Sequence, residues 1–343
     1  MHCMYHYKIP QKFAVGETIP IPELSRRCGA DEETLTRLVQ HAVPKGFLGQ
    51  PVPGQVAHTA FSAMLAASPE ITDWVGYVCE DLQPAAAHLP HALTKWPGPP
   101  WRPDQTGHNL AAGRSGTFWD TLADDPVRAR RFASSMSFMQ QLPGWQPAAA
   151  LEPDIFDWGA LDPDAVVVDV GGGDGTFAVA LADRHRKLKR IVVQDTPVVV
   201  KEARPGIPVH LHHVIELQSH DFFHPQPVRG ADIYFLRKIL HDWPDEFAIK
   251  ILQQLIPALK PGARILINDD FLPLPVVLSP NQEWRVRGQD LAMMALFNSK
   301  ERTGAQWEGL IRRADPRFNL KSVTPMAPGP LSLIEVVWEK TSV

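Results

Sequence analysis

The sequence predicts an α/β fold with a mostly parallel, doubly wound sheet in its second half and a smaller helical domain before it. Two observations lead to this prediction. The stretch Ala165–Leu181 has the pattern of a buried strand, a glycine-rich turn and a helix, which is the order that opens a βαβ unit. Further short apolar runs at 190–195, 233–236 and 265–268 alternate with helical patterns. Residues Pro147–Asp154 then form the expected linker.

Length and composition limit the class of protein. The 343 residues suffice for two domains, which we place at residues 1–150 and 151–343. A net charge of −4 gives no strong field for nucleic acid or an anionic membrane. The three cysteines lack metal-ligand spacing, and no apolar run approaches a membrane span. We therefore expect a cytoplasmic protein with no metal, no membrane partner and no nucleic-acid partner.

The first domain shows a helix, turn, helix and wing pattern. A short helix follows IPIPEL, a second helix covers Glu32–Val43, and Pro53-Gly54 forms the tip of a small hairpin. This pattern is typical of a winged helix, which either binds DNA or serves as an architectural or dimerising domain. The basic groups available to DNA are few and scattered, which favours the second interpretation: Arg37, His41 and Lys45.

Further helical patterns cover residues 71–82, 118–122 and 129–139. His108 follows a proline-rich loop, where a single histidine is more often a packing residue than a functional one. Met136 and Met139 fit a helix core, although adaptable methionines also line pockets for flat aromatic molecules.

The glycine turn identifies the kind of ligand expected. A dinucleotide fingerprint would need glycine at position 176, where the chain has Thr176. The chain has an acid-x-G-x-G-x-G pattern instead, formed by Asp169, Gly171, Gly173 and Gly175. That pattern is typical of class I S-adenosylmethionine (SAM) methyltransferases, because a carboxylate can meet the ammonium of SAM and bare backbone permits close approach.

Acidic and aromatic residues after the next strands extend this prediction. Asp195 ends the second strand, where a carboxylate can accept both ribose hydroxyls of a nucleoside, or alternatively cap the helix before Pro197. Asp221 and Phe222 follow the third strand, where they can meet an adenine by a hydrogen bond and by face contact.

A second informative stretch surrounds His241. It lies just beyond the strand 233–236, at the edge where open α/β sheets bind ligands. Asp269 and Asp270 leave the next strand at the same edge. No third ligand pattern accompanies this acidic pair, so we predict a hydrogen-bonding role toward His241 in preference to a metal site. Glu301 can cap the following helix, form a salt bridge or reach this edge.

The chain closes with a helix and a hairpin. The helix covers Glu283–Phe297 and is rich in methionine and leucine, including Met294. The hairpin comprises Leu320–Pro325 and Leu331–Glu339, around a turn at Pro328–Pro330.

The motifs together resemble a known family. DVGGGDG, FLRKILHDWPDE, INDDFLP and NSKERT are similar to motifs of the plant- and fungal-type SAM-dependent small-molecule O-methyltransferases. PGQVAHTAFS and MMALFNSKERT point to the fungal group that acts on secondary metabolites of polyketide type. The resemblance covers nearly the whole chain. It implies a Rossmann-like methyltransferase domain preceded by a winged-helix domain that dimerises and contributes to the acceptor pocket.

The resemblance also implies roles for individual residues. His241 would be the general base, held by Asp269 and Glu301. The cofactor-binding residues would be Asp169, Gly171, Gly172, Gly173, Asp195, Asp221, Phe222 and Arg237. The substrate-binding residues would be His108, Met136, Met139, Met294 and Asn298.

The expected activity is methyl transfer from SAM to a hydroxyl of an aromatic metabolite. One alternative is a pericyclase, because some fungal relatives of this fold keep SAM but catalyse dehydration or cycloaddition. Another is a winged-helix regulator with SAM as effector. The resemblance implies a homodimer, although few of the family's N-terminal pairing helices precede the winged helix.

Overall fold

The structure is a computed structural model, and it describes residues 1–327 and 329–339. Two compact units divide the chain: Met1–His88 with Trp119–Met139, and Leu89–Phe118 with Gln140–Val343. The sequence suggested a single boundary near residue 150. In the structure the chain passes from one unit to the other three times, at residues 89, 119 and 140. Helical periodicity identifies a buried face but not the partner that covers it, so this exchange has no signal in the sequence.

The first unit contains the elements expected of a winged helix. The Asp31 side chain caps helix α3 by accepting a hydrogen bond from the Thr34 backbone at 2.8 Å. Strands β1 and β2 pair antiparallel, and Gly49 bridges to Ala57 to extend this small sheet. Its elements are α1 (His2–His6), η1 (Ile9–Lys12), β1 (Thr18–Pro20), α2 (Ile21–Cys28), α3 (Glu32–Ala42), β2 (Gln55–Ala57), α4 (Ala60–Ala67), α5 (Pro69–Tyr77), the π-helix η2 (Val78–Leu82), α9 (Pro126–Met139), most of α8 (Phe118–Asp124) and the beginning of α6 (Gln83–Lys95).

The second unit is built on a seven-stranded sheet in the order β5-β4-β3-β6-β7-β9-β8. The first five strands of this order are parallel, while β9 and β8 are antiparallel to their neighbours. The expected terminal hairpin is confirmed as β8 and β9, although Pro328 of its turn lies outside the described residues. The strands are β3 (Val166–Val170), β4 (Arg190–Asp195), β5 (Ile215–Ser219), β6 (Ile233–Arg237), β7 (Arg264–Asp270), β8 (Phe318–Pro325) and β9 (Leu331–Trp338).

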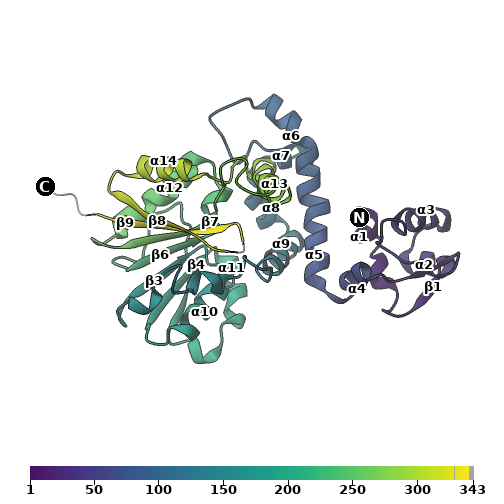
Figure 1. Cartoon of the computed structure of the whole chain (residues 1–343), viewed down its shortest axis with the longest axis horizontal. Coiled ribbons are helices and arrows are strands. Elements are labelled where there is room, and N and C mark those ends of the chain that lie inside the picture. Colours follow the sequence, from purple (N-terminus) through teal and green to yellow (C-terminus); the bar gives the residue numbers. More distant parts are fainter. Residues whose placement is uncertain (328, 340–343) are drawn as a thin grey trace. The chain divides into compact units, whose positions relative to one another are not determined.

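Helices cover both faces of this sheet, as a doubly wound fold requires. In Figure 1, α12 and α14 lie on one side of the sheet and α10 on the other. None of the helices in residues 1–327 and 329–339 combines the length and apolar character of a membrane span. The helices of this unit are the end of α6, α7 (Gly107–Ala112), η3 (Pro147–Leu151), η4 (Trp158–Ala160), α10 (Thr176–Arg184), α11 (Pro197–Ala203), η5 (Arg204–Gly206), η6 (Val209–Leu211), η7 (Leu240–Asp242), α12 (Asp245–Leu255), η8 (Ile256–Ala258), α13 (Pro280–Phe297) and α14 (Gly304–Ala314).

The core beneath α10 fixes the position of the glycine turn. The rings of Phe177 on α10 and Phe235 on β6 stack with their centroids 3.9 Å apart, and Trp158 packs edge-on against both. The Trp158 indole donates a hydrogen bond of 2.8 Å to the Ala150 carbonyl, which satisfies its one polar atom. Aromatic burial therefore fixes α10 against β6, the strand next to β3 in the sheet.

The register of the parallel strands brings the predicted site residues to one edge. Val170, the last residue of β3, pairs with Gln194 of β4 and Leu236 of β6. Arg237, the last residue of β6, pairs with Asn268 of β7. The loops that follow these strands therefore begin side by side, at the carboxyl edge where open α/β sheets bind ligands.

Candidate active site

The glycine turn between β3 and α10 is held against the end of β4. The Gly171 and Gly172 backbone N–H groups donate to the Gln194 carbonyl, at 2.8 and 3.0 Å. The Gly173 N–H donates to Oδ2 of Asp195 at 3.0 Å. Gly171 and Gly173 adopt positive φ angles of 71° and 59°, a region that L side chains rarely adopt. The turn thus has a fixed backbone and no side chains on its glycines.

Gly172 has no room for a side chain. A Cβ there would lie 2.6 Å from Oδ2 of Asp169 and 2.8 Å from Cγ1 of Val193. At Gly171 a Cβ would lie 2.4 Å from Cδ1 of Ile239. The backbone of the turn therefore lies directly against the buried carboxylate of Asp169.

Asp169 is the best candidate for a cationic part of a ligand. Its side chain is 1% exposed, and among the described residues its Oδ2 atom has no hydrogen-bond partner. Burial raises its pKa to about 7, against the opposing charge of Arg237. A buried carboxylate oxygen without a partner is costly unless a cation or donor reaches it. The ammonium of SAM meets this requirement, so the residues present fit that cofactor.

The other predicted cofactor residues lie around this turn with different partners. Asp195 accepts from the backbone of Gly173 and, at 2.7 Å, of Thr196. This carboxylate contacts the glycine turn and the residue before α11, but it does not cap α11, which begins after Thr196 without a side-chain cap. Burial raises the pKa of Asp195. Asp221 is more exposed and engages its own loop, through the Phe223 N–H at 2.9 Å and Nδ1 of His224 at 3.0 Å.

Phe222 and Arg237 complete the cofactor set. Cε1 of Phe222 would lie 3.8 Å from a Cβ at Gly171, so this ring borders the turn. The rings of Phe222 and Trp243 also lie near each other, with their centroids 6.0 Å apart. Arg237 donates to the Trp145 carbonyl, and its Nε atom is buried without a partner among the described residues.

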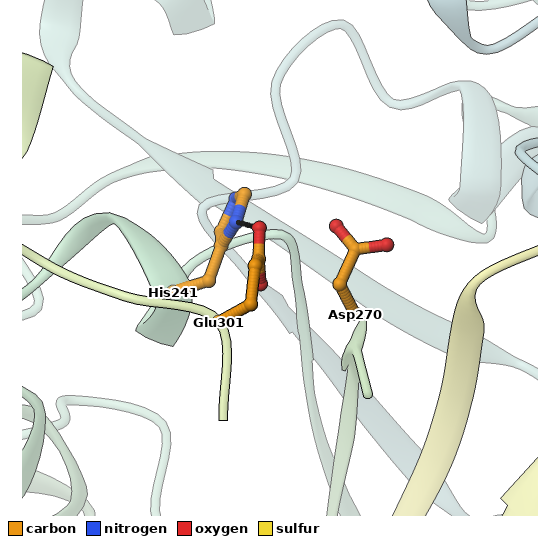
Figure 2. Close-up of side chains that lie close together, drawn as sticks. All are labelled: His241, Asp270 and Glu301. Atoms are coloured by element: carbon orange, nitrogen blue, oxygen red, sulfur yellow. Dashed lines mark hydrogen bonds and ion pairs between the residues drawn. The ribbon is translucent and has the colours of Figure 1, made fainter. Parts of the chain in front are cut away.

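His241 lies in the single turn of 3-10 helix η7, directly after β6. Nδ1 of His241 lies 2.9 Å from Oε1 of Glu301, and Figure 2 shows this contact as a dashed line. Nε2 lies 3.3 Å from Oδ1 of Asp242. All three side chains are buried. The carboxylate of Glu301 accepts the proton on Nδ1, which leaves the lone pair on Nε2 as the basic atom.

The surroundings make His241 a stronger base than a free imidazole. Burial by itself lowers its pKa, but the carboxylates of Asp242 and Glu301 outweigh burial and the opposing charge of Lys238. The net effect raises the pKa of His241 to about 9. Burial raises the pKa of Glu301 as well.

Arg302 fastens the turn that carries His241. Its guanidinium is fully buried and donates to the carbonyls of Leu240 at 2.7 Å and Trp243 at 2.8 Å, on either side of the histidine. It also donates to Oδ1 of Asp245 at 3.0 Å. Arg302 follows Glu301 directly, so one short segment supplies both the partner of the histidine and the anchor of its turn.

Asp269 does not form the predicted hydrogen bond to His241. Within the described part of the chain, neither of its carboxylate oxygens has a hydrogen-bond partner. Asp270 is the β7 residue with a carboxylate oxygen within 4.8 Å of both a ring nitrogen of His241 and a carboxylate oxygen of Glu301. Adjacent residues of a strand point to opposite faces, so only one of the two acids can approach the histidine in this way. Asp269 still interacts with His241 through charge, because the charge of His241 lowers the pKa of Asp269 against the effect of burial.

The sequence interpretation gave no role to three residues around His241: Lys238, Asp242 and Arg302. Asp242 follows His241 in the motif HDW, and Arg302 follows Glu301 in KERT, so both were visible as motif residues. Lys238 had no signal, because a strand pattern places it beyond β6 without showing which way its side chain turns.

The predicted substrate residues lie in both units. In the second unit, buried His108 lies on α7, which packs against α13, and its ring meets Phe118 edge-on at 5.1 Å. Met294 is half-buried on α13. Asn298 caps α13 with a φ of 53° and donates to the Arg102 carbonyl at 3.2 Å. Met136 and Met139 lie on α9 of the first unit. Their contact with a substrate remains a prediction.

Comparisons with known proteins identify the family of this chain. A family model described as an O-methyltransferase domain matches residues 102–316. The O-methyltransferase AMT9 of Alternaria alternata is 36% identical over 321 residues, which cover 92% of this chain and 72% of that protein. A chlorophenol O-methyltransferase of Trichoderma longibrachiatum is 35% identical over 339 residues, 97% of this chain and 72% of that protein.

Solved structures share the fold. The complex of LepI with SAM superposes with a TM-score of 0.79 at 28% identity, over 97% of this chain and 83% of that one. The complex of OxaC with S-adenosylhomocysteine and oxaline superposes with a TM-score of 0.84 at 23% identity, over 98% of this chain and 84% of that one. Because the family model spans more than half of the chain and curated relatives exceed 30% identity over nearly all of it, the chain belongs to the O-methyltransferase family.

Proposed function

We propose that this enzyme methylates a hydroxyl of an aromatic, polyketide-type secondary metabolite, with SAM as the methyl donor and His241 as the general base. The observation that carries the proposal is the buried pair in which Nδ1 of His241 lies 2.9 Å from Glu301. An O-methyltransferase must remove a proton from a weak acid, and this pair is a base held by a carboxylate, as in a catalytic triad.

The glycine turn and its neighbours would hold the cofactor. The backbone of Gly171–Gly173 would lie against it, Asp169 would pair with its ammonium, and Asp195 would accept from its ribose. The cofactor is S-adenosyl-L-methionine, which supplies a methyl group bound to a positively charged sulfur. These residues bind and orient; none of them takes part in proton transfer.

His241 removes the proton from the acceptor hydroxyl through Nε2. A phenol has a pKa of about 10 and a free imidazole about 6.5, a gap of about 3.5 units or ~5 kcal/mol. With a pKa of about 9 for His241, the gap falls to about one unit, or ~1.4 kcal/mol. Glu301 and Asp242 supply this change by stabilising the imidazolium that forms.

Relatives support phenols as the acceptor class. The Trichoderma relative carries the name chlorophenol O-methyltransferase, and a relative from Cladonia grayi, 34% identical over 342 residues, is an O-methyltransferase of the grayanic acid biosynthesis cluster. An acceptor with an acidic hydroxyl matches a histidine base, because an aliphatic alcohol would leave a much larger proton-transfer gap.

A pericyclase is the second candidate. One solved structure, described as a pericyclic reaction enzyme, superposes with a TM-score of 0.78 at 27% identity. The buried base with its carboxylate partner favours methyl transfer over cycloaddition, because a cycloaddition removes no proton. The homodimer, the cytoplasmic location and the substrate roles of His108, Met136, Met139, Met294 and Asn298 belong to the same proposal.

Product stoichiometry tests the proposal. The enzyme would be incubated with methyl-labelled SAM and a panel of phenols and aromatic polyketides. We expect labelled ether and S-adenosylhomocysteine in equal amounts. Conversion of an acceptor without S-adenosylhomocysteine would favour the pericyclase and overturn methyl transfer.

A further inference from the structure

Three buried side chains lie close together, and one of them is the proposed base. One ring nitrogen of His241 and one carboxylate oxygen each of Asp270 and Glu301 lie within 4.8 Å of one another, and Figure 2 shows these side chains near one another on three segments of the chain. A positive charge is expected among them. The ammonium of Lys238 supplies one: it forms an ion pair with Oδ2 of Asp270 and lies 3.4 Å from Nδ1 of His241.

The backbone directs Lys238 into this position. It follows the last residue of β6 and has a φ of 57°, which is uncommon for a residue other than glycine. Its N–H donates to the Asn268 carbonyl of β7 at 3.0 Å, so the turned backbone is fixed to the sheet. The ammonium lies 4.7 Å from the ring centroid of Trp145, and the side chain is 20% exposed. Lys238 is therefore held on one side by a carboxylate and on another by an aromatic ring.

The charges around His241 are unbalanced without Lys238. Elements packed around η7 supply several charged groups near its residues. They include Lys238 and Arg237 from β6 and its end, Asp242 of η7 itself, Asp245 of α12, Asp269 and Asp270 of β7, Asp290 of α13, and Lys300, Glu301 and Arg302 of the segment after α13. Arg302 and Lys300 pair with Asp245, and Asp290 accepts from the Glu301 N–H. The acids left beside the histidine outnumber the cations.

We propose that Lys238, held by Asp270, is the positioning residue that opposes a second proton on His241 and so lowers the pH at which this histidine becomes able to accept a proton from the acceptor. This inference rests on the proposed function, in which His241 is the base. Nδ1 of His241 donates to Glu301, so the ammonium beside it disfavours a second proton on the ring. Asp242 and Glu301 favour the imidazolium, and Lys238 opposes them.

The titration behaviour of the groups agrees with this geometry. Burial lowers the pKa of Lys238, but Asp270, Glu301 and Asp269 outweigh it and raise that pKa above its ordinary value, so the ammonium persists. Lys238 in turn lowers the pKa of His241 against the carboxylates. The lysine thus restricts the basicity that Glu301 and Asp242 confer.

Two substitutions that act in opposite directions test the proposal. Lys238→Met removes the cation and should raise the pKa of His241 by about one unit or more. Asp270→Asn removes an anion but leaves the ammonium of Lys238, so this substitution should lower the pKa of His241. Lys238→Arg keeps the charge and should restore the wild-type pKa. The matched control is Lys260→Met, which breaks the pair of Lys260 with Asp232 near the other end of β6.

The readout is NMR titration of histidine-labelled protein, with the His241 signal identified by its absence in His241→Asn. This measurement needs no acceptor, so it is independent of the activity test. A protein that methylates no acceptor but shows both pKa shifts would refute the function and keep this inference.

In active enzyme, the acidic limb of the kcat/KM profile should move to higher pH in Lys238→Met. If Lys238→Met does not fold, the change in the pKa of His241 in Asp270→Asn and the His241 titration curve of Lys238→Arg test the proposal. Three results would overturn the proposal: an unchanged His241 titration in Lys238→Met, an upward shift in Asp270→Asn, or activity that is lost with EDTA and restored by a divalent cation.

Discussion

His241 and Glu301, 60 residues apart in the sequence, meet at 2.9 Å between Nδ1 and Oε1 in a buried site. The two side chains come from different segments, the turn after β6 and the segment after α13. Each therefore depends on how the other segment is anchored.

Glu301→Gln should weaken the base without disturbing the cofactor. The substitution removes the negative charge that favours the imidazolium, so the pKa of His241 falls. Loss of the charged hydrogen bond costs about 1.5–3 kcal/mol, which corresponds to a fall in kcat of roughly 10- to 150-fold. Steady-state kinetics and calorimetric SAM titration measure the two effects. Glu308→Gln, on α14, is the control and should leave both unchanged; equal kcat values for Glu301→Gln and wild type would contradict the role of Glu301.

Arg302→Lys should destabilise the protein and lower kcat. Lysine cannot reach both carbonyls and Asp245 with the planar geometry of a guanidinium, so a buried charge loses partners. We expect the free energy of unfolding to fall by about 3 kcal/mol, near the lower limit for a broken buried pair, because Asp245 is partly exposed. Denaturant unfolding measures this change. Exposed Arg312→Lys on α14 is the comparison, and similar stability of the two variants would show that Arg302 is not the anchor.

Gly172→Ala should lose both stability and SAM affinity. Its Cβ would lie 2.6 Å from Oδ2 of Asp169 and 2.8 Å from Val193, and such overpacking costs about 1–3 kcal/mol. The displaced Asp169 would then fail to meet the cofactor. The control is Gly206→Ala, where a Cβ meets nothing within 4 Å and φ is not positive. Thermal unfolding with and without SAM should separate the two; a Gly172→Ala protein that binds SAM normally would exclude the proposed contact.

SAM affinity should rise with pH as Asp169 ionises. Because burial raises the pKa of Asp169 to about 7, the carboxyl group is neutral below that pH and attracts an ammonium only above it. An α-amino group itself loses its proton near pH 8, so affinity should be greatest at about pH 7–8. Calorimetry from pH 5.5 to 9 measures the profile. In Asp169→Asn the acidic limb should vanish, and a limb that persists would assign the titration to another group.

The sequence contained most of the fold because its signals are local. The glycine turn, the apolar run of Val166–Val170 and the cap at Asp31 each act within a few residues, and the structure confirms all three elements. The pairing of His241 with Glu301 was also expected, through the motifs HDW and KERT. Motifs identify residue types and spacing, and here those correspond to neighbours in space.

The sequence-based predictions were wrong or silent where the direction of a side chain determines which neighbour it contacts. Asp269 and Asp270 are adjacent, and only the pleat of β7 determines which carboxylate lies closer to the histidine. Lys238 lies at a backbone turn with positive φ, which no propensity predicts for lysine. The exchange of segments between the two units depends on packing partners, which periodicity does not identify.

The central claim is that His241 takes the acceptor proton, and the pH dependence of turnover in His241→Ala tests it most directly. Wild-type kcat/KM should rise with pH up to about 9, the pKa of His241 in the free enzyme. His241→Ala should lower kcat by about 10²–10⁴, as for a lost general base. SAM affinity should be unchanged, and rising pH should partly restore turnover as solvent ionises the phenol. A variant with wild-type kcat and the wild-type pH profile would contradict the account and make His241 a structural residue.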